Sequence, residues 1–118
     1  ELKIERVTCA VDCGQAVNPN IIEQQMHSGI VYGLTAALRG SITIEMGAVR
    51  ESNFHDYRLL AIHEVPPIDV HLIASGVSPG GCGVPATPVI APALANAIFA
   101  ATGRRLRALP LEPQLRLT

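Results

Sequence analysis

The period of apolar and polar positions changes several times along the chain, and each change predicts an element. Residues 3–11 alternate imperfectly between apolar and polar side chains, which predicts a strand. Its apolar face carries Val7, Cys9 and Val11. The sequence Asp12-Cys13-Gly14 is typical of a turn that ends a strand.

A long amphipathic helix is predicted next. Asn18 is a favourable N-cap, Pro19 suits the first helical position, and Gly40 is typical of a helix end. Apolar residues recur between them with the helical period: Ile22, Met26, Ile30, Leu34, Ala37 and Leu38. Gly29 and Gly33 share one face, although each glycine costs roughly 1 kcal/mol relative to alanine. They indicate close approach by another backbone or a ligand, and we favour tight packing of the helix on a sheet.

The middle of the chain reads as a hairpin, a long connection and a strand. Residues 41–46 alternate cleanly, and residues 48–52 can return beside them after a turn at Gly47. Residues 53–67 have no period and form the connection. Residues 68–74 form the next strand.

The last third begins with a loop rich in glycine and proline, residues 75–88. A helix follows, with Thr87 as its expected cap and Pro88 at its first position, and Gly103 ends it. Residues 107–110 are expected to form a short final strand, and residues 111–118 have no regular pattern.

This order of elements predicts an α+β fold. We expect a two-layer arrangement of the split βαβ kind, in which two helices cover one face of a mixed sheet. The length of 118 residues fits one domain. Because the chain starts at Glu1 and enters a strand almost at once, we expect residues 1–118 to be a piece of a longer protein.

Composition narrows the function classes. Hydrophobic residues make up 48% and charged residues 16%, as in globular proteins. A net charge of −1 and an aromatic content of 3% argue against nucleic acid as a partner. The longest apolar stretch, residues 89–101, is too short to cross a bilayer. The three cysteines, Cys9, Cys13 and Cys82, are expected to be free and mostly buried thiols.

The residues alone give few chemical signals. Four histidines are scattered over different elements without the spacing of ligand pairs, so we expect no metal site built from this chain's side chains. The run Gly80-Gly81-Cys82-Gly83 precedes a helix and can offer backbone N–H groups to an anion. It matches neither a Walker loop nor a dinucleotide-binding fingerprint.

Five motifs occur in a familiar order. They are Val11-Asp12-Cys13-Gly14 with Val17-Asn18-Pro19, Gln25 through Gly29, Ser52 through Tyr57, Gly80 through Pro85, and Pro92 through Gly103. This series resembles the C-terminal end of the molybdopterin-binding large subunit of the xanthine dehydrogenase and aldehyde oxidase superfamily. Within that superfamily, the beta subunits of the isoquinoline 1-oxidoreductase group are the most similar, and the resemblance covers almost the whole chain.

The resemblance implies part of a molybdenum hydroxylase, an oxidoreductase that uses water to hydroxylate an aldehyde or an N-heterocycle. It implies a molybdopterin-type molybdenum cofactor in the full-length subunit, and none held by this chain alone. The implied partners are the remainder of the large subunit and an iron–sulfur subunit or domain. The isolated chain is expected to be inactive, and its compartment stays open between cytoplasm and periplasm.

The resemblance also implies which residues approach the cofactor: Gln25, Ser28, Gly29, Gly81, Cys82 and Gly83. In the family, the amide side chain corresponding to Gln25 hydrogen-bonds the pterin. The small Ser28 and Gly29 allow close approach, and backbone N–H groups of the glycine-rich loop line the cofactor. His27 stands where the family often has an acidic residue, which leaves its role open.

The catalytic position departs from the family pattern Gly-x-Gly-Glu-Pro, in which Glu is the general base. This chain has Val84 there, and valine accepts no proton. Val84 indicates a relative with altered or lost activity, or an engineered or misread position; Gly83 and Pro85 argue against a shifted register. The alternative function is therefore a stand-alone or degenerate, non-catalytic domain for cofactor binding or assembly.

Overall fold

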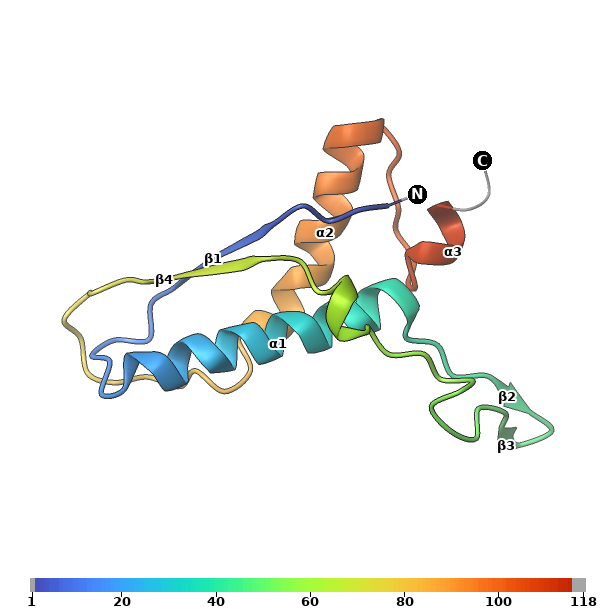
Figure 1. Cartoon of the computed structure of the whole chain (residues 1–118), viewed down its shortest axis with the longest axis horizontal. Helices are drawn as coiled ribbons and strands as arrows, with labels where there is room; N and C mark the ends of the chain where they lie inside the picture. The colour runs from blue at the N-terminus through green and yellow to red at the C-terminus, as the bar shows by residue number, and fades with distance from the viewer. Residues whose placement is uncertain (1, 116–118) are drawn as a thin grey trace.

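The structure, a computed structural model, describes residues 2–115. Its elements are β1 (Val7–Val11), α1 (Pro19–Arg39), β2 (Ile44–Glu45), β3 (Ala48–Val49), the 3-10 helix η1 (Ile62–Glu64), β4 (Ile68–Leu72), α2 (Ala86–Thr102) and α3 (Glu112–Leu115). Figure 1 shows α1 running along the molecule, with β1 and β4 side by side and α2 crossing α1 at a steep angle. The predicted α+β class is confirmed, with two main helices packed on a small parallel sheet.

The sheet consists of β1 and β4, paired in parallel with Val7 opposite Ile68 and Val11 opposite Leu72. On β1 the odd-numbered residues are half-buried and the even-numbered ones exposed, which confirms the predicted apolar face. Parallel neighbours need a crossover connection, and α1 provides it. The carboxyl ends of both strands therefore lie at the same edge of the sheet.

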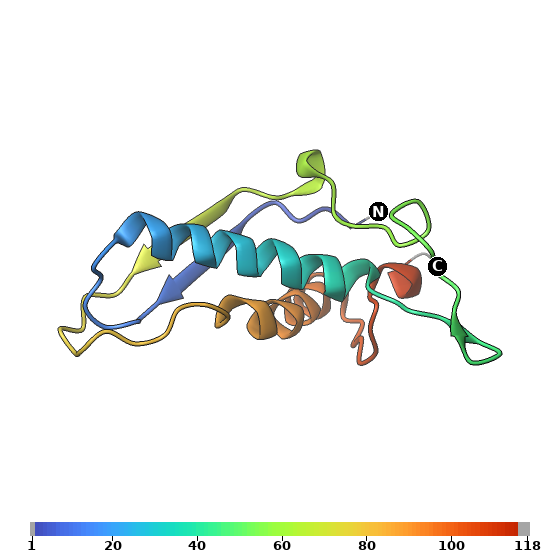
Figure 2. The same cartoon turned by 90° about the horizontal axis from the view of Figure 1, so that it is seen from below.

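The predicted hairpin forms, but it is shorter than expected and does not join the sheet. β2 and β3 have two residues each and make a separate antiparallel pair. All four of their residues are exposed, so no apolar face holds the hairpin against β1 or β4. In Figure 2 it projects beyond the carboxyl end of α1. The expected mixed sheet is thus two separate two-stranded sheets.

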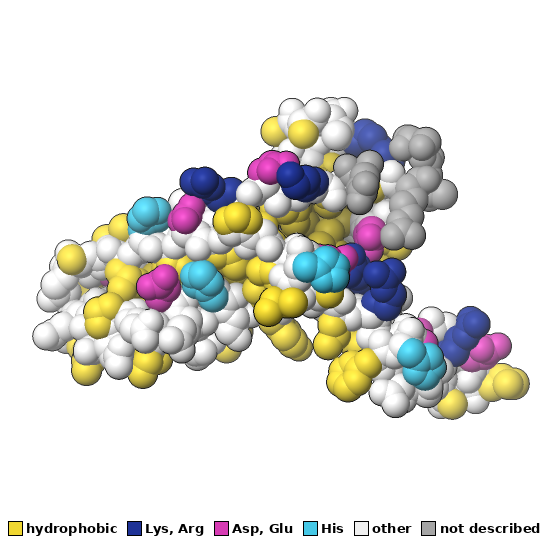
Figure 3. Space-filling model, viewed as in Figure 1, with side chains coloured by type: hydrophobic (Ala, Val, Ile, Leu, Met, Phe, Trp, Pro, Cys, Tyr) yellow, Lys and Arg dark blue, Asp and Glu magenta, His cyan; other side chains and the backbone are white. Residues whose placement is uncertain are grey.

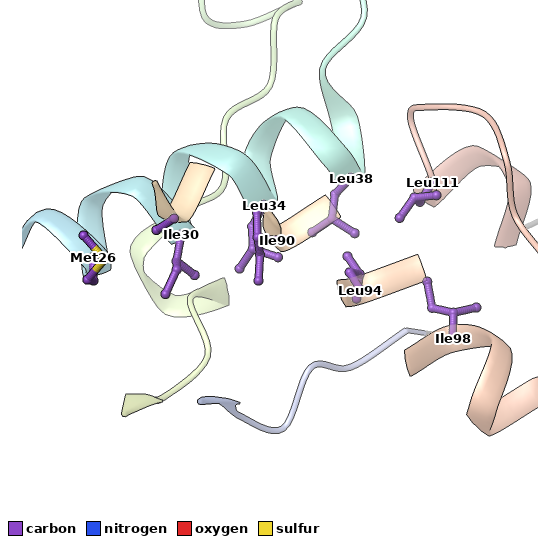
Figure 4. Packing of buried hydrophobic residues seen from close by; sticks show 9 residues of the cluster. Met26, Ile30, Leu34, Leu38, Ile90, Leu94, Ile98 and Leu111 are labelled. Atoms are coloured by element: carbon purple, nitrogen blue, oxygen red, sulfur yellow. The ribbon is translucent and has the colours of Figure 1, made fainter. Parts of the chain in front are cut away.

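The core lies between α1 and α2. All six periodic residues predicted for α1, from Ile22 to Leu38, are buried. From α2 they meet residues spaced four apart, of which Ile90, Leu94 and Ile98 are labelled in Figure 4. Leu111, which belongs to no long element, completes this cluster with 1% exposure.

Three expectations for the last third were wrong. Residues 107–110 form no strand, because Pro110 lacks an N–H for a ladder and the Gln114 side chain donates to the Ala108 and Pro110 carbonyls at 2.7 and 2.9 Å. The segment then forms α3 instead of irregular chain, and residues 116–118 lie outside the described residues. Thr87 is not the cap and Pro88 is not the first helical residue, because α2 already begins at Ala86.

Candidate functional site

The first half of α1 carries three of the predicted site residues. The Asn18 side chain accepts a hydrogen bond from the Ile21 N–H at 3.2 Å and fixes the start of the helix. Gln25 is half-buried, Ser28 is exposed and Gly29 is buried. Within residues 2–115, the Gln25 side chain has no hydrogen-bond partner, so its amide is available to another group.

Gly29 and Gly33 face α2 instead of a sheet. A Cβ added at Gly29 would lie 3.0 Å from the Ala86 Cβ, and one at Gly33 would lie 2.6 Å from the Thr87 carbonyl oxygen. The Thr87 hydroxyl donates to the Gly29 carbonyl at 3.3 Å. The predicted close approach by another backbone is therefore present, and a second helix makes it.

The contact between Gly29 and the start of α2 places the glycine-rich loop, which directly precedes α2, next to α1. The chain from β4 to α2 runs along the first half of α1 in both Figure 1 and Figure 2. The Cys82 side chain packs against the core cluster, whereas Gly81 and Gly83 on either side are exposed. The loop is thus anchored by one side chain and presents its backbone outward.

Gly81 and Gly83 of this loop have no internal reason to be glycine. A Cβ at Gly81 or Gly83 would meet nothing within 4 Å, and neither residue has a positive φ. By contrast, Gly33 would collide with Ile90 of α2. The two bare backbone positions therefore leave room for close approach by a group outside this chain.

The position of the family's base is open to solvent. Val84 is 68% exposed and lies two residues before Ala86, where α2 begins. Two carboxylates that the sequence places nearest to it are already paired: Glu64 contacts Arg39, and Asp69 lies 3.3 Å from Arg6. Both carboxylates therefore make ion pairs with residues outside the glycine-rich loop.

The carboxyl edge of the sheet forms a cleft of about 500 Å³ beside this loop. Its walls come from the turn after β1 and the segment after β4: Cys13, Gly14, Gln15, Ala16, Leu72, Ile73, Ala74 and Gly76. All three cysteines are free thiols, as expected, but they are half-buried, not mostly buried. Burial raises the pKa of the Cys9 thiol.

His27 lies on α1 between the predicted cofactor residues. Its Nε2 is 3.8 Å from a carboxylate oxygen of Glu23, and that buried nitrogen has no hydrogen-bond partner within the described chain. Residues 2–115 contain no group of three or more His, Cys, Asp or Glu side chains arranged to hold a metal ion. Among the same residues, no helix is both long and apolar enough to cross a membrane.

Sequence reasoning missed an ionic cluster at the other end of α1. The Arg39 guanidinium, 12% exposed, donates to Glu64 and, at 2.8 Å, to Glu112. Hydrogen bonds from Arg39 and from the Ala61 N–H lower the pKa of Glu64 to about 2. The three charges lie far apart in the sequence, so no local pattern could have found them.

Comparisons with known proteins identify the class of this domain. The sequence profile of the molybdopterin cofactor-binding domain family matches residues 1–66, more than half of the chain. The chain belongs to this family. It is 40% identical over 114 residues to the beta subunit of isoquinoline 1-oxidoreductase from Brevundimonas diminuta, covering 97% of this chain and 15% of the relative. It is 34% identical over 112 residues to a nicotinate dehydrogenase subunit from Pseudomonas putida, covering 94% and 9%.

Solved structures share the fold. Quinoline 2-oxidoreductase from Pseudomonas putida 86 superimposes with a TM-score of 0.78 at 22% identity, over 89% of this chain and 14% of that one. The Cu,Mo-CO dehydrogenase superimposes with a TM-score of 0.73 at 24% identity, over 86% and 14%. The chain therefore matches a segment of molybdenum hydroxylase large subunits and spans a small part of their length. The predicted resemblance is confirmed.

Proposed function

We propose that this chain forms one wall of a molybdopterin site in the large subunit of a molybdenum hydroxylase. The observation that carries the proposal is the exposed, bare backbone of Gly81 and Gly83, for which the chain itself gives no packing reason. Family membership supports a molybdopterin as the approaching group. The unpaired Gln25 amide on α1 supplies a polar contact of the right type.

The residues present fit the binding of this cofactor. Gln25 would hydrogen-bond the pterin, Ser28 would leave room at the exposed surface of α1, and the N–H groups of Gly81 through Gly83 would face the cofactor. Cys82 would hold the loop to the core by its side chain. When bound, the molybdenum centre supplies two-electron oxidation of an aldehyde or N-heterocycle, with oxygen from water.

The sequence position of Gly29 suggested a contact with the cofactor, but in this proposal it packs against α2 instead. Because it is buried against Ala86 and Thr87, it brings the loop to the helix and does not itself offer a surface. The remainder of the large subunit would form the other walls of the site. An iron–sulfur subunit or domain would accept the electrons.

A second candidate is a non-catalytic cofactor-binding domain, and Val84 favours it. An exposed valine cannot accept the proton that the reaction must remove, and general base catalysis is typically worth ~10²–10⁴-fold in rate. Both candidates share the same binding wall. They differ in whether the site becomes catalytic once a base stands at position 84, so one substitution at that position can distinguish them.

A graft tests both. This chain would replace the matching segment in the isoquinoline 1-oxidoreductase beta subunit of Brevundimonas diminuta, and the purified protein would be assayed for molybdenum, pterin and turnover of isoquinoline. We expect retained cofactor and turnover reduced by ~10²–10⁴-fold. Val84→Glu should restore turnover, whereas the control Val84→Gln, which has the same shape without the base, should not.

Three outcomes would count against one or both of these functions. A folded graft without molybdenum and pterin would reject the binding wall. Full turnover in the graft with Val84 would reject the argument that a base is missing, and failure of Val84→Glu to raise turnover would favour the non-catalytic candidate.

A further inference from the structure

The turn after β1 is hydrogen-bonded to the segment that leads into the glycine-rich loop. The Gly80 N–H donates to the Cys13 carbonyl at 2.7 Å, and the Gln15 N–H donates to the Val77 carbonyl at 2.9 Å. These bonds join segments more than sixty residues apart in the chain. They end at Gly80, the residue directly before the exposed backbone of Gly81.

The Asp12 carboxylate adds a side-chain connection between the same two segments. Its Oδ1 accepts hydrogen bonds from the Ser75 hydroxyl at 2.7 Å and from the Gly14 N–H at 3.0 Å. The bonds from Ser75 and Gly14 hold the pKa of this carboxyl below its usual value, so it stays ionised at neutral pH. One side chain thus fixes both the shape of the turn and the start of the loop.

Gly14 is the tightest point of this junction. It has a φ of +75°, and an added Cβ would collide with the Ser78 carbonyl oxygen and lie 2.9 Å from the Val77 carbonyl oxygen. The residue is buried. Any larger residue must therefore push the segment before Gly80 away from the turn.

We propose that Asp12 and Gly14 are positioning residues that set the place of the Gly80–Gly83 loop at the cofactor wall. The consequence for the cofactor rests on the function proposed above. The positioning itself rests only on contacts within this chain. Asp12 and Gly14 act through the Cys13–Gly80 bond and need not touch the cofactor.

The first test compares two alanine substitutions by amide hydrogen exchange, followed by NMR on the 118-residue chain. Gly14→Ala and Gly47→Ala both place alanine at a positive φ, +75° and +80°, but only position 14 lacks space for the methyl group. Leu111, whose N–H is bonded to the Ala37 carbonyl, reports global unfolding. We expect the ratio of the Gly80 to the Leu111 amide exchange rate to rise at least about tenfold in Gly14→Ala and to stay unchanged in Gly47→Ala. A tenfold rise means that the free energy needed to open the Gly80 hydrogen bond falls by ~1.4 kcal/mol.

Asp12 is tested by loss and rescue in the same measurement. Asp12→Ala removes the acceptor for Ser75 and Gly14 and should raise the ratio of Gly80 to Leu111 exchange. Asp12→Asn keeps an oxygen that can accept both hydrogen bonds and should bring the ratio back towards the native value. An unchanged ratio in both Gly14→Ala and Asp12→Ala would overturn the inference.

The grafted subunit separates this inference from the proposed function. If the graft with Gly14 retains molybdenum and pterin, Gly14→Ala should lower both contents below those of Gly47→Ala. Equal contents, with the exchange difference present, would overturn the effect on the cofactor wall. A graft that never holds cofactor would reject the proposed function, whereas the exchange result would still decide the positioning.

Discussion

Glycine is needed at different positions of this chain for different physical reasons, and the structure distinguishes these positions. Gly29 and Gly33 give space to α2, and Gly14 combines a positive φ with contact to Ser78. Gly81 and Gly83 have neither a crowded surrounding nor a positive φ. The difference predicts opposite results for substitutions that look alike in the sequence.

Gly33→Ala should destabilise the chain. Alanine improves helix propensity by roughly 1 kcal/mol, but its methyl group would collide with Ile90 and lie 2.6 Å from the Thr87 carbonyl oxygen. Because overpacking of a core contact costs about 1–3 kcal/mol, we expect a net loss of up to ~2 kcal/mol. The free energy of unfolding, measured in urea, checks this value.

Gly81→Ala is the matched control for stability. Its methyl group would meet open space, so the unfolding free energy should change by less than about 0.5 kcal/mol. In the grafted subunit, however, the same change should reduce the molybdenum content, because the methyl group projects from the proposed wall. Equal destabilisation by both alanines would contradict the assignment of Gly33 to helix packing.

The position and the buried face of α1 could be predicted from the sequence because several local signals agree. Asn18, Pro19 and the apolar period agree with one another, and the helix forms with its predicted start and buried face. Gly29 and Gly33 also signalled a close approach, but not its partner. Which helix or sheet fills that space depends on residues more than fifty positions away, such as Thr87 and Ile90.

The hairpin and the C-terminal segment show the limit of local patterns. Alternation at residues 41–46 predicted a strand, but only Ile44 and Glu45 pair, because no neighbouring surface buries either face. Near the C-terminus, Leu111 is fixed by a long-range contact instead of by periodicity. Its side chain enters the core, and its N–H donates to the Ala37 carbonyl at 2.8 Å.

Leu111→Ala should therefore lower the free energy of unfolding more than expected for a residue outside the two long helices. The side chain is 1% exposed and lies in the cluster between α1 and α2, so its removal should cost about 2–5 kcal/mol. Leu109, two residues earlier, is 58% exposed, and Leu109→Ala should cost less than about 0.5 kcal/mol. Thermal and urea unfolding compare the two, and similar losses would show that Leu111 is not a core residue.

The Arg39 cluster predicts how stability depends on pH. The pKa of Glu64 is lowered from 4.5 to about 2, so the folded state holds its proton less tightly than the unfolded state does. The resulting stabilisation is complete above pH 4.5 and decreases as the pH falls towards 2. Urea unfolding at a series of pH values from 7 to 3 measures the decrease.

Arg39→Met identifies the source of that dependence. At pH 7 the variant should lose about 1–3 kcal/mol, because Glu64 and Glu112 lose a shared donor. Below pH 4.5 Glu64 takes up a proton in the unfolded native-sequence chain while it stays ionised in the folded one, which lowers the stability of that chain; the stability difference between the two proteins should therefore narrow. A difference that stays constant from pH 7 to 3 would exclude the ion pair as its cause.

The whole molecule is less compact than its length would allow. Its radius of gyration is 16.5 Å, compared with about 13.5 Å for a compact domain of this size. Large apolar side chains remain exposed, among them Met46 at 100%, Ile62 at 92% and Phe54 at 74%. Figure 3 shows such side chains on several parts of the surface, including the projecting hairpin. This shape agrees with a segment whose relatives are several times longer.

The same openness predicts that the 118-residue chain alone does not hold the cofactor tightly. Small-molecule sites usually enclose 70–90% of a ligand's surface, whereas Gly81, Gly83 and Val84 are exposed and provide one wall. After expression in a host that makes molybdopterin and after gel filtration, elemental analysis should find molybdenum far below one atom per chain. The grafted subunit, purified in the same way, should retain it. Stoichiometric molybdenum in the isolated chain would mean that residues 1–118 enclose the cofactor by themselves, and the proposal of a single wall would have to be abandoned.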